Sequence, residues 1–176
     1  MAARNRLPPW HEMIRTADGR EVLIRPIRPE DAVPLGAALP LLQPDALHAS
    51  FLHGKAPSAE TLERLSKPDP RREFALVASE PLQPGEAVIG AVARVSVVGD
   101  TRQGEFAILV GRFLAGMGLG RHLMRRLVRW AKGKKLERLY GDVAEDNQPM
   151  LALAQSLGFR RESAAAPGYV RVVLDL

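Results

Sequence analysis

The chain has 176 residues, of which 46% are hydrophobic and 26% charged, with a formal net charge of +5 and no cysteine. This length fits one domain with a sizeable core, and the composition is typical of a soluble globular protein rather than a disordered or membrane-spanning one. The lack of cysteine excludes disulfides, thiolate zinc sites and cysteine nucleophiles, and the four histidines are scattered without metal-ligand spacing. We therefore expect neither a metal site nor a membrane partner.

The N-terminal segment "MAARNRLPPWHEMIR" contains basic residues, but no apolar run follows them. A secretory signal needs such a run, so we expect a cytoplasmic protein. We interpret residues 1–9 as a flexible arm and residues 10–176 as a single domain.

The first predicted element is a β-hairpin over residues 10–27. Two β-prone segments flank Asp18-Gly19, a dipeptide that favours tight hairpin turns. Three short helices are predicted next. The first begins at Pro29 and is kept short by Pro34, because proline interrupts helical hydrogen bonding. The other two span residues 44–52 and 58–66.

A β-meander is predicted over residues 73–111. The segments "EFALVASE", "AVIGAVARVSVV" and "GEFAILVG" are apolar and β-prone, and "PLQPGE" and "GDTRQG" between them contain turn-forming residues. We expect three sequential antiparallel strands.

The rest of the chain alternates helices and strands. Apolar residues recur every four positions from Leu119, which predicts an amphipathic helix that Gly133 ends. A strand over 136–144, a helix over 145–159 with Gly158 in a left-handed conformation, and strands near 159–163 and over 169–176 follow. This order predicts an α+β domain with a mixed sheet.

Three glycines, Gly116, Gly118 and Gly120, precede the amphipathic helix. They permit close approach of a ligand to the backbone, and the first N–H groups of the helix favour an anion. A dinucleotide fingerprint would need glycine where Leu123 stands, and a nucleoside-triphosphate loop would need lysine at Met117. Neither motif is present, and on this local pattern an anion site and a purely steric turn remain equal alternatives.

Residues 118–135 contain seven basic residues and no acidic one. Such a segment can contact phosphates or nucleic acid, or it can be a solvated helix face. We favour the solvated face for Arg125, Arg126 and Arg129, which lie progressively further from the start of the helix. A nucleic-acid-binding domain is the weakest alternative, because Trp130 is the only aromatic residue in the run and no nucleic-acid motif is present.

The stretch "EFAILVGRFLAGMGLGRHLMRRLVRWA" followed by "LERLYGDVAEDNQPMLALAQSLGF" resembles the acetyl-CoA-binding half of the GNAT N-acetyltransferase superfamily. The resemblance covers residues 105–159, and the order of elements in the whole chain agrees with it. It implies a GNAT fold, an α+β fold with a mixed, mostly antiparallel central sheet flanked by helices.

The segments "DGREVLIRPIRPEDA" and "RREFALVA" narrow the resemblance to the acetyltransferase domain of Pat-type protein lysine acetyltransferases. In those proteins the domain is often fused to another one, whereas here we expect it to stand alone. The resemblance implies transfer of acetyl from acetyl-CoA to a primary amine, with a protein lysine as the leading acceptor, by direct attack in a ternary complex. A small-molecule amine, a protein N-terminus and a non-catalytic acyl-CoA-binding module remain alternatives, and the oligomeric state stays open, a homodimer included.

The resemblance also assigns coenzyme contacts. The family has a bulge in the strand before the glycine turn, and Leu109 and Val110 occupy the positions whose main chain pairs with the pantetheine arm. Asn147 matches an asparagine that contacts the coenzyme, and it also suits a helix N-cap. Turn and helix amides would hold the pyrophosphate, and they belong to Gly116, Met117, Gly118, Gly120 and Arg121.

Glu105 matches the glutamate that such enzymes use as general base, with Glu73 in reserve. Bulge amides near Val110 are expected to polarise the thioester carbonyl. The sequence departs from the family at Ala115, which replaces a Gln or Arg, and at Ala154, which stands where a tyrosine acid is frequent. The leaving thiolate could then take its proton from water, from the ammonium, or from Tyr140 or Tyr169.

Overall fold

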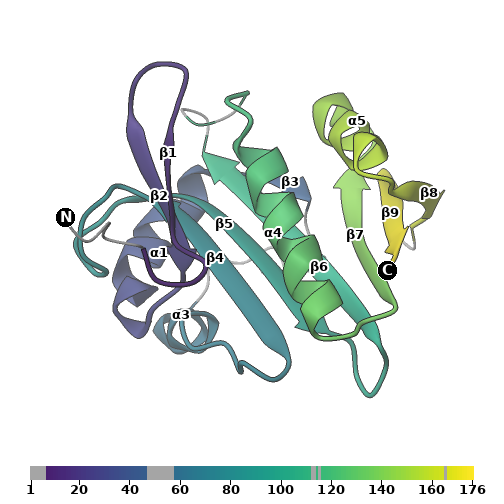
Figure 1. The fold of residues 1–176 in the computed structure, drawn as a ribbon, viewed down its shortest axis with the longest axis horizontal. Helices are drawn as coiled ribbons and strands as arrows, with labels where there is room; N and C mark the ends of the chain where they lie inside the picture. The colour runs from purple at the N-terminus through teal and green to yellow at the C-terminus, as the bar shows by residue number, and fades with distance from the viewer. Residues whose placement is uncertain (1–6, 47–57, 112–113, 115, 165) are drawn as a thin grey trace, which may run out of the picture.

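The computed structural model describes residues 7–46, 58–111, 114, 116–164 and 166–176. Among these residues, nine strands form one sheet in the order β1-β2-β4-β5-β6-β7-β9-β8, with β3 paired to β6 beside this path (Figure 1). The strands are β1 (Glu12–Arg15), β2 (Glu21–Pro26), β3 (Leu42–Ala46), β4 (Glu73–Ser79), β5 (Ile89–Val97), β6 (Gln103–Gly111), β7 (Arg138–Ala144), β8 (Arg160–Ser163) and β9 (Tyr169–Asp175). The helices are α1 (Ala32–Ala38), α3 (Ala59–Leu65), α4 (Leu119–Gly133) and α5 (Gln148–Ser156), with short 3₁₀ turns η1 (Pro29–Asp31) and η2 (Leu39–Leu41).

The sheet is mixed, as the sequence predicted. The hairpin β1–β2 and the meander β4–β5–β6 are antiparallel. Among the described residues, β6 and β7 are the one parallel pair, over three residues, because α4 carries the chain back to the end of the sheet where β6 began. The antiparallel strands β9 and β8 complete the sheet.

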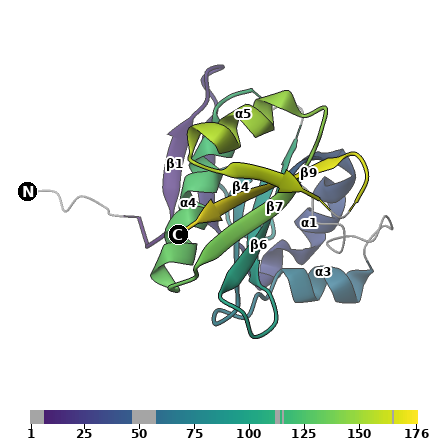
Figure 2. The same ribbon diagram turned by 90° about the vertical axis from the view of Figure 1, so that its right-hand side faces the viewer.

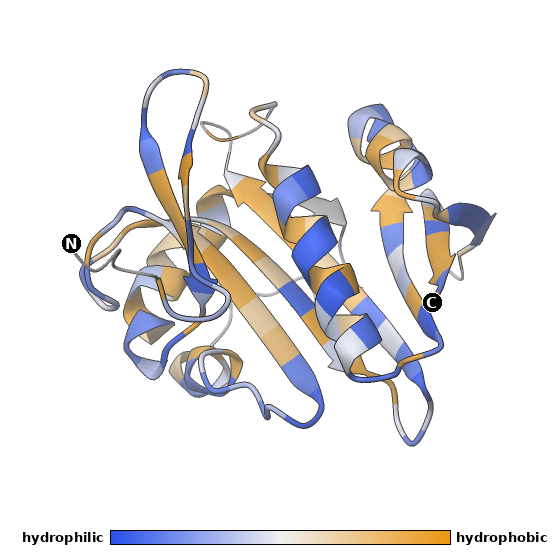
Figure 3. Ribbon diagram, viewed as in Figure 1, coloured by the Kyte–Doolittle hydropathy of each residue, from blue (hydrophilic) through white to orange (hydrophobic). Residues whose placement is uncertain are grey.

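Helices cover both faces of the sheet. Figure 2 shows α4 on the opposite face from α1 and α3, with the strands between them. Apolar side chains of α4 and α5 pack on one face against Phe106, Ile108 and Val110 of β6, whereas Leu109 packs on the other face with α1 and α3. Figure 3 shows hydrophobic colours along the central strands and hydrophilic ones on the outer surface of α4. No helix in the described part of the chain is long and apolar enough to span a membrane.

The predicted helix over residues 44–52 is wrong where the structure describes it. Residues 42–46 form strand β3, which pairs antiparallel with β6 through a register shift between Pro44 and Ala46. Proline lacks the N–H donor of a ladder and is therefore tolerated at such irregularities. Residues 47–52 lie outside the described residues.

The basic face of α4 differs in part from the expectation. Arg125 and Arg129 are exposed, as expected for a solvated face, and Arg129 also lies over the Trp10 ring. Arg126 is not solvated: its side chain is only 17% exposed and forms an ion pair with Glu12. It also donates to the Trp10 carbonyl oxygen at 3.3 Å, which fixes the segment before β1 on α4.

Candidate active site

Four polar side chains form a row across neighbouring strands. Glu73 of β4 pairs in register with Ser96 of β5, Ser96 pairs with Glu105 of β6, and Glu105 pairs with Tyr140 of β7. Residues in register on adjacent strands project to the same face, about 4.8 Å apart. The row therefore lies on the face opposite α4, where β6 and β7 stop pairing and diverge (Figure 1).

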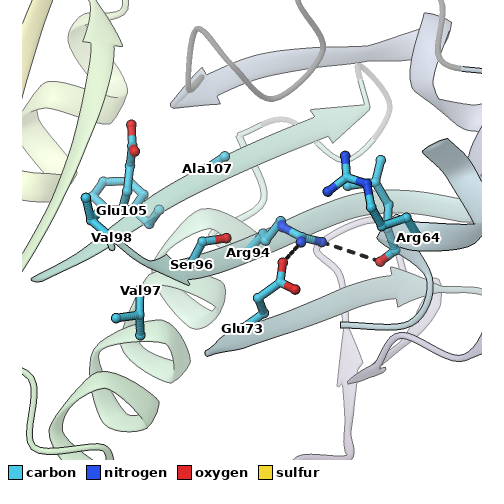
Figure 4. A pocket seen from close by; sticks show the side chains of 10 residues that line it. Arg64, Glu73, Arg94, Ser96, Val97, Val98, Glu105 and Ala107 are labelled. Carbon is cyan, nitrogen blue, oxygen red and sulfur yellow. Dashed lines mark hydrogen bonds and ion pairs between the residues drawn. The ribbon is translucent and has the colours of Figure 1, made fainter. Parts of the chain in front are cut away.

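A cavity of about 250 Å³ adjoins this row (Figure 4). Apolar side chains, two carboxylates and two guanidinium groups line it together, and one of the carboxylates, that of Glu73, is paired with Arg94. Its lining residues are Arg64, Leu65, Glu73, Arg94, Ser96, Val97, Val98, Glu105, Phe106 and Ala107.

Glu73 is already engaged by a buried cation. Its carboxylate forms an ion pair with Arg94, whose side chain is 8% exposed, and also accepts from the Asp69 N–H at 3.2 Å. Figure 4 shows Arg94 between Glu73 and the backbone of α3, where it donates to the Leu65 carbonyl oxygen at 3.4 Å. Burial, and then the nearby Arg64, lower the pKa of Arg94 to about 10. Glu73 thus compensates a buried charge.

Glu105 has a different neighbour. The Tyr140 hydroxyl donates to Glu105 Oε2 at 3.5 Å. Burial raises the pKa of Tyr140, and the charge of Glu105 adds to this effect, so the phenol stays protonated. Arg171 of β9 lies 4.6 Å from the centre of the Tyr140 ring and forms a two-pronged ion pair with Asp142, at 2.9 and 3.2 Å.

A second cavity, of about 430 Å³, opens at the start of α4. Gly118 is the N-cap of α4 with φ +77°, a left-handed conformation that glycine adopts without strain. The helix N–H groups at this end lack helical partners and favour an anion. The lining residues are Val110, Leu114, Gly116, Gly118, Leu119, Gly120, Arg121, Asn147, Pro149, Met150 and Leu153.

Six of the eight predicted coenzyme residues line this second cavity. The remaining two do not: Leu109 is buried on the opposite face of the sheet, and Met117 is half-buried in the turn. Asn147 is also the N-cap of α5, and its side chain accepts from the Met150 N–H at 3.3 Å. Arg121 donates to the Ser156 hydroxyl at 3.1 Å, which links the start of α4 to the end of α5.

The edge of β6 beside the second cavity is occupied. A strand has two edges, and β5 takes one of them from Gly104 to Val110. On the other edge β7 pairs with residues 103–105, so β3, which pairs with residues 108–111, lies between β6 and β7 (Figure 1). The β5–β6 register is regular throughout, so the bulge expected in β6 is absent from that ladder.

Of the two departures from the family pattern, at Ala115 and Ala154, the structure describes only the second. Ala115 lies outside the described residues. Ala154 is fully buried in the core, and its methyl side chain carries no hydroxyl. Tyr169 lines another cavity near β8, which leaves Tyr140 as the tyrosine beside Glu105. No local sequence pattern indicates the Glu73–Arg94 ion pair or the pairing of β3 with β6, because both depend on contacts between distant segments.

Comparison with known proteins decides the family. The Acetyltransferase (GNAT) domain family matches residues 21–160. This chain belongs to the GNAT acetyltransferase family. An acetyltransferase of Pseudomonas aeruginosa is 32% identical over 143 residues, which cover 81% of this chain and 76% of the relative. As a GNAT acetyltransferase, the protein uses acetyl-CoA as its co-substrate.

Solved structures show the same fold. The GNAT domain of S. lividans PAT superposes with a TM-score of 0.74 and 23% identity, covering 97% of this GNAT chain and 100% of that one. A GNAT-family acetyltransferase from Streptococcus pneumoniae gives a TM-score of 0.67 at 22% identity, covering 88% and 99%. A cAMP-binding acyltransferase from Mycobacterium smegmatis gives 0.62 at 23% identity, and there the match covers 94% of this chain but 46% of the larger protein. The predicted GNAT fold is confirmed.

Proposed function

We propose that this acetyltransferase acetylates protein lysine side chains, with Glu105 as general base and the coenzyme bound at the start of α4. One observation carries the proposal: a single strand, β6, joins the two cavities. Glu105, Phe106 and Ala107 line the first cavity, and Val110 lines the second. From Glu105 to Val110 the strand advances by five residues, or about 17 Å, and an extended pantetheine arm can run over this length.

The second cavity suits the phosphates of the coenzyme. The amides of Gly116, Gly118, Gly120 and Arg121 lie at the positive end of α4, where anions are stabilised. Arg121 adds a guanidinium at the same rim. Met117 and Leu109, although they do not line the cavity, remain part of the proposed set through their main-chain groups alone.

The pantetheine arm would then extend along the β6 edge at Leu109 and Val110, as an added strand. Because β3 pairs with this edge, we infer that coenzyme binding displaces β3. The β6 N–H groups released in this way would hydrogen-bond to the arm and polarise the thioester carbonyl oxygen. The apparent affinity for the coenzyme is then the intrinsic affinity multiplied by the fraction of molecules in which the edge is free.

The first cavity suits a lysine. Leu65, Val98 and Ala107 provide apolar walls for its four-carbon stem, and Glu105 provides a carboxylate for its ammonium. In the reaction, Glu105 takes a proton from the ammonium, and the amine nitrogen forms a bond to the thioester carbonyl carbon. The carbon–sulfur bond then breaks, the amide nitrogen loses its remaining extra proton to water, and the water passes a proton to the thiolate. Glu73 is less suited as base, because its carboxylate is paired with Arg94.

Acetyl-CoA titration by calorimetry, followed by acetylation of lysine peptides, free amines and peptide N-termini, tests the proposal. Glu105→Gln should lower turnover by about 10²- to 10⁴-fold while coenzyme affinity stays the same. Glu137→Gln is the matched control, because Glu137 is an exposed glutamate in a loose 3.8 Å pair with Arg102. Failure to bind acetyl-CoA would overturn the whole proposal. Coenzyme binding without transfer to any amine would instead favour a non-catalytic acyl-CoA-binding module.

A further inference from the structure

We propose that Tyr140 is a positioning residue for the general base: its hydroxyl holds the Glu105 carboxylate in place at the edge of the first cavity. This inference rests on the proposed role of Glu105. The sequence left Tyr140 as one of several proton donors for the leaving thiolate, but the geometry points to a partner of the base instead.

The position of Tyr140 is set by the sheet. Tyr140 and Glu105 are the last residues in register before β6 and β7 diverge, so their side chains project together at the point of divergence. The next β7 residue, Gly141, lies under the Phe106 ring, where an added Cβ would approach ring carbons to 2.6–2.8 Å. This close packing sets how near β7 lies to β6, and it therefore limits the separation of Tyr140 from Glu105.

The Tyr140 ring is held from the other side. Arg171 lies 4.6 Å from the ring centre, and Asp142 orients its guanidinium through two hydrogen bonds. A guanidinium over a ring face is attracted to it and limits the motion of the ring. The Asp142 side chain is 13% exposed and that of Arg171 31%, so this support is partly shielded from solvent.

The hydrogen bond has a chemical consequence. A phenol that donates to a carboxylate favours the ionised carboxylate, which is the form a general base needs. Burial and Glu105 raise the pKa of Tyr140, so the phenol keeps the proton that it donates across the working pH range. The other charged groups around Glu105 are Glu73 of β4, Arg94 of β5, Arg64 of α3, and Asp142 and Arg171 beyond Tyr140.

The test compares Tyr140→Phe with the wild type in the pH dependence of kcat/KM for the amine. Loss of a hydrogen bond to a charged group should lower kcat/KM by about 10- to 100-fold. The acidic limb of the profile should move to higher pH by about one unit, because the carboxylate is then protonated more readily. The KM for acetyl-CoA should stay the same. Tyr169→Phe is the matched control, since Tyr169 lines a separate cavity near β8, away from Glu105.

The double variant Glu105→Gln with Tyr140→Phe separates positioning from direct proton donation. If Tyr140 acts through Glu105, its substitution causes no further loss in the Glu105→Gln background. A further loss there, or an unchanged acidic limb in Tyr140→Phe alone, would overturn the inference. An active Glu105→Gln variant would instead remove the proposed base itself, so the two failures are distinguishable. A thermal melt of each variant shows whether a lower rate reflects unfolding.

Discussion

Gln43 of β3 pairs in register with Val110 of β6, on the edge of β6 that faces β7. This places a segment of the chain where the pantetheine arm is proposed to lie. Acetyl-CoA should therefore release β3, and amide hydrogen exchange of residues 42–46 should accelerate on coenzyme addition. The β6 amides of residues 108–111 should stay protected, because the arm takes over their hydrogen bonds.

3′-Phosphoadenosine 5′-diphosphate, the nucleotide portion of the coenzyme, is the control ligand for this experiment. It carries phosphate for the α4 end but no pantetheine arm, so it should leave the exchange of residues 42–46 unchanged. Continued protection of β3 at saturating acetyl-CoA would mean that the arm binds elsewhere.

The ion pair between Glu73 and Arg94 predicts a change in stability rather than in chemistry. Glu73→Gln leaves the Arg94 guanidinium buried without a counter-charge, which should lower the free energy of unfolding by about 3 kcal/mol. Glu105→Gln removes a carboxylate that contacts the neutral Tyr140 hydroxyl, and it should cost much less. Urea denaturation of both variants measures the difference. A stable Glu73→Gln enzyme that has lost turnover would make Glu73 the base.

The elements that the sequence predicts well are those with local patterns. The turn at Asp18-Gly19, the period of α4 and the cap at Asn147 each depend on residues close in sequence, and all three were confirmed. Strand β3 could not be predicted, because its pairing with β6 is set by a distant segment, and Pro44 within it suggested the start of a helix. Elements stabilised by local interactions can thus be predicted from the sequence, whereas β3, which depends on a long-range interaction, cannot.

The same division holds in the candidate site. The glycine turn and Glu105 could be found from spacing and resemblance. The contact of Tyr140 with Glu105 depends on the parallel register of β6 and β7, two strands that are distant in the sequence and connected through α4. The prediction of a solvated Arg126 is wrong for a similar reason, since its partners Glu12 and Trp10 lie near the N-terminus.

Arg126 and Arg125, adjacent on α4, should differ in their contribution to stability. Arg126→Gln removes the ion pair with Glu12 and the hydrogen bond to the Trp10 carbonyl, which should cost about 1 kcal/mol once solvent screening at the half-exposed Glu12 is allowed for. Arg125 is exposed, so Arg125→Gln should stay within about 0.5 kcal/mol of the wild type. Thermal unfolding of both variants at one salt concentration checks this. Equal effects would argue that the segment before β1 is not fixed by Arg126.

Gly118 should matter for coenzyme binding through its backbone alone. At φ +77° a residue with a Cβ is strained by about 1 to 2 kcal/mol, although an added Cβ would meet no atom within 4 Å. Gly118→Ala should therefore relax the turn away from its anion-binding conformation and weaken acetyl-CoA affinity by about tenfold. Gly99 also has positive φ, +51°, and open space around it, but lies in the β5–β6 turn. Gly99→Ala should lower stability comparably and leave affinity unchanged in calorimetric titration. Similar affinity in both variants would mean that the turn amides do not hold the phosphates.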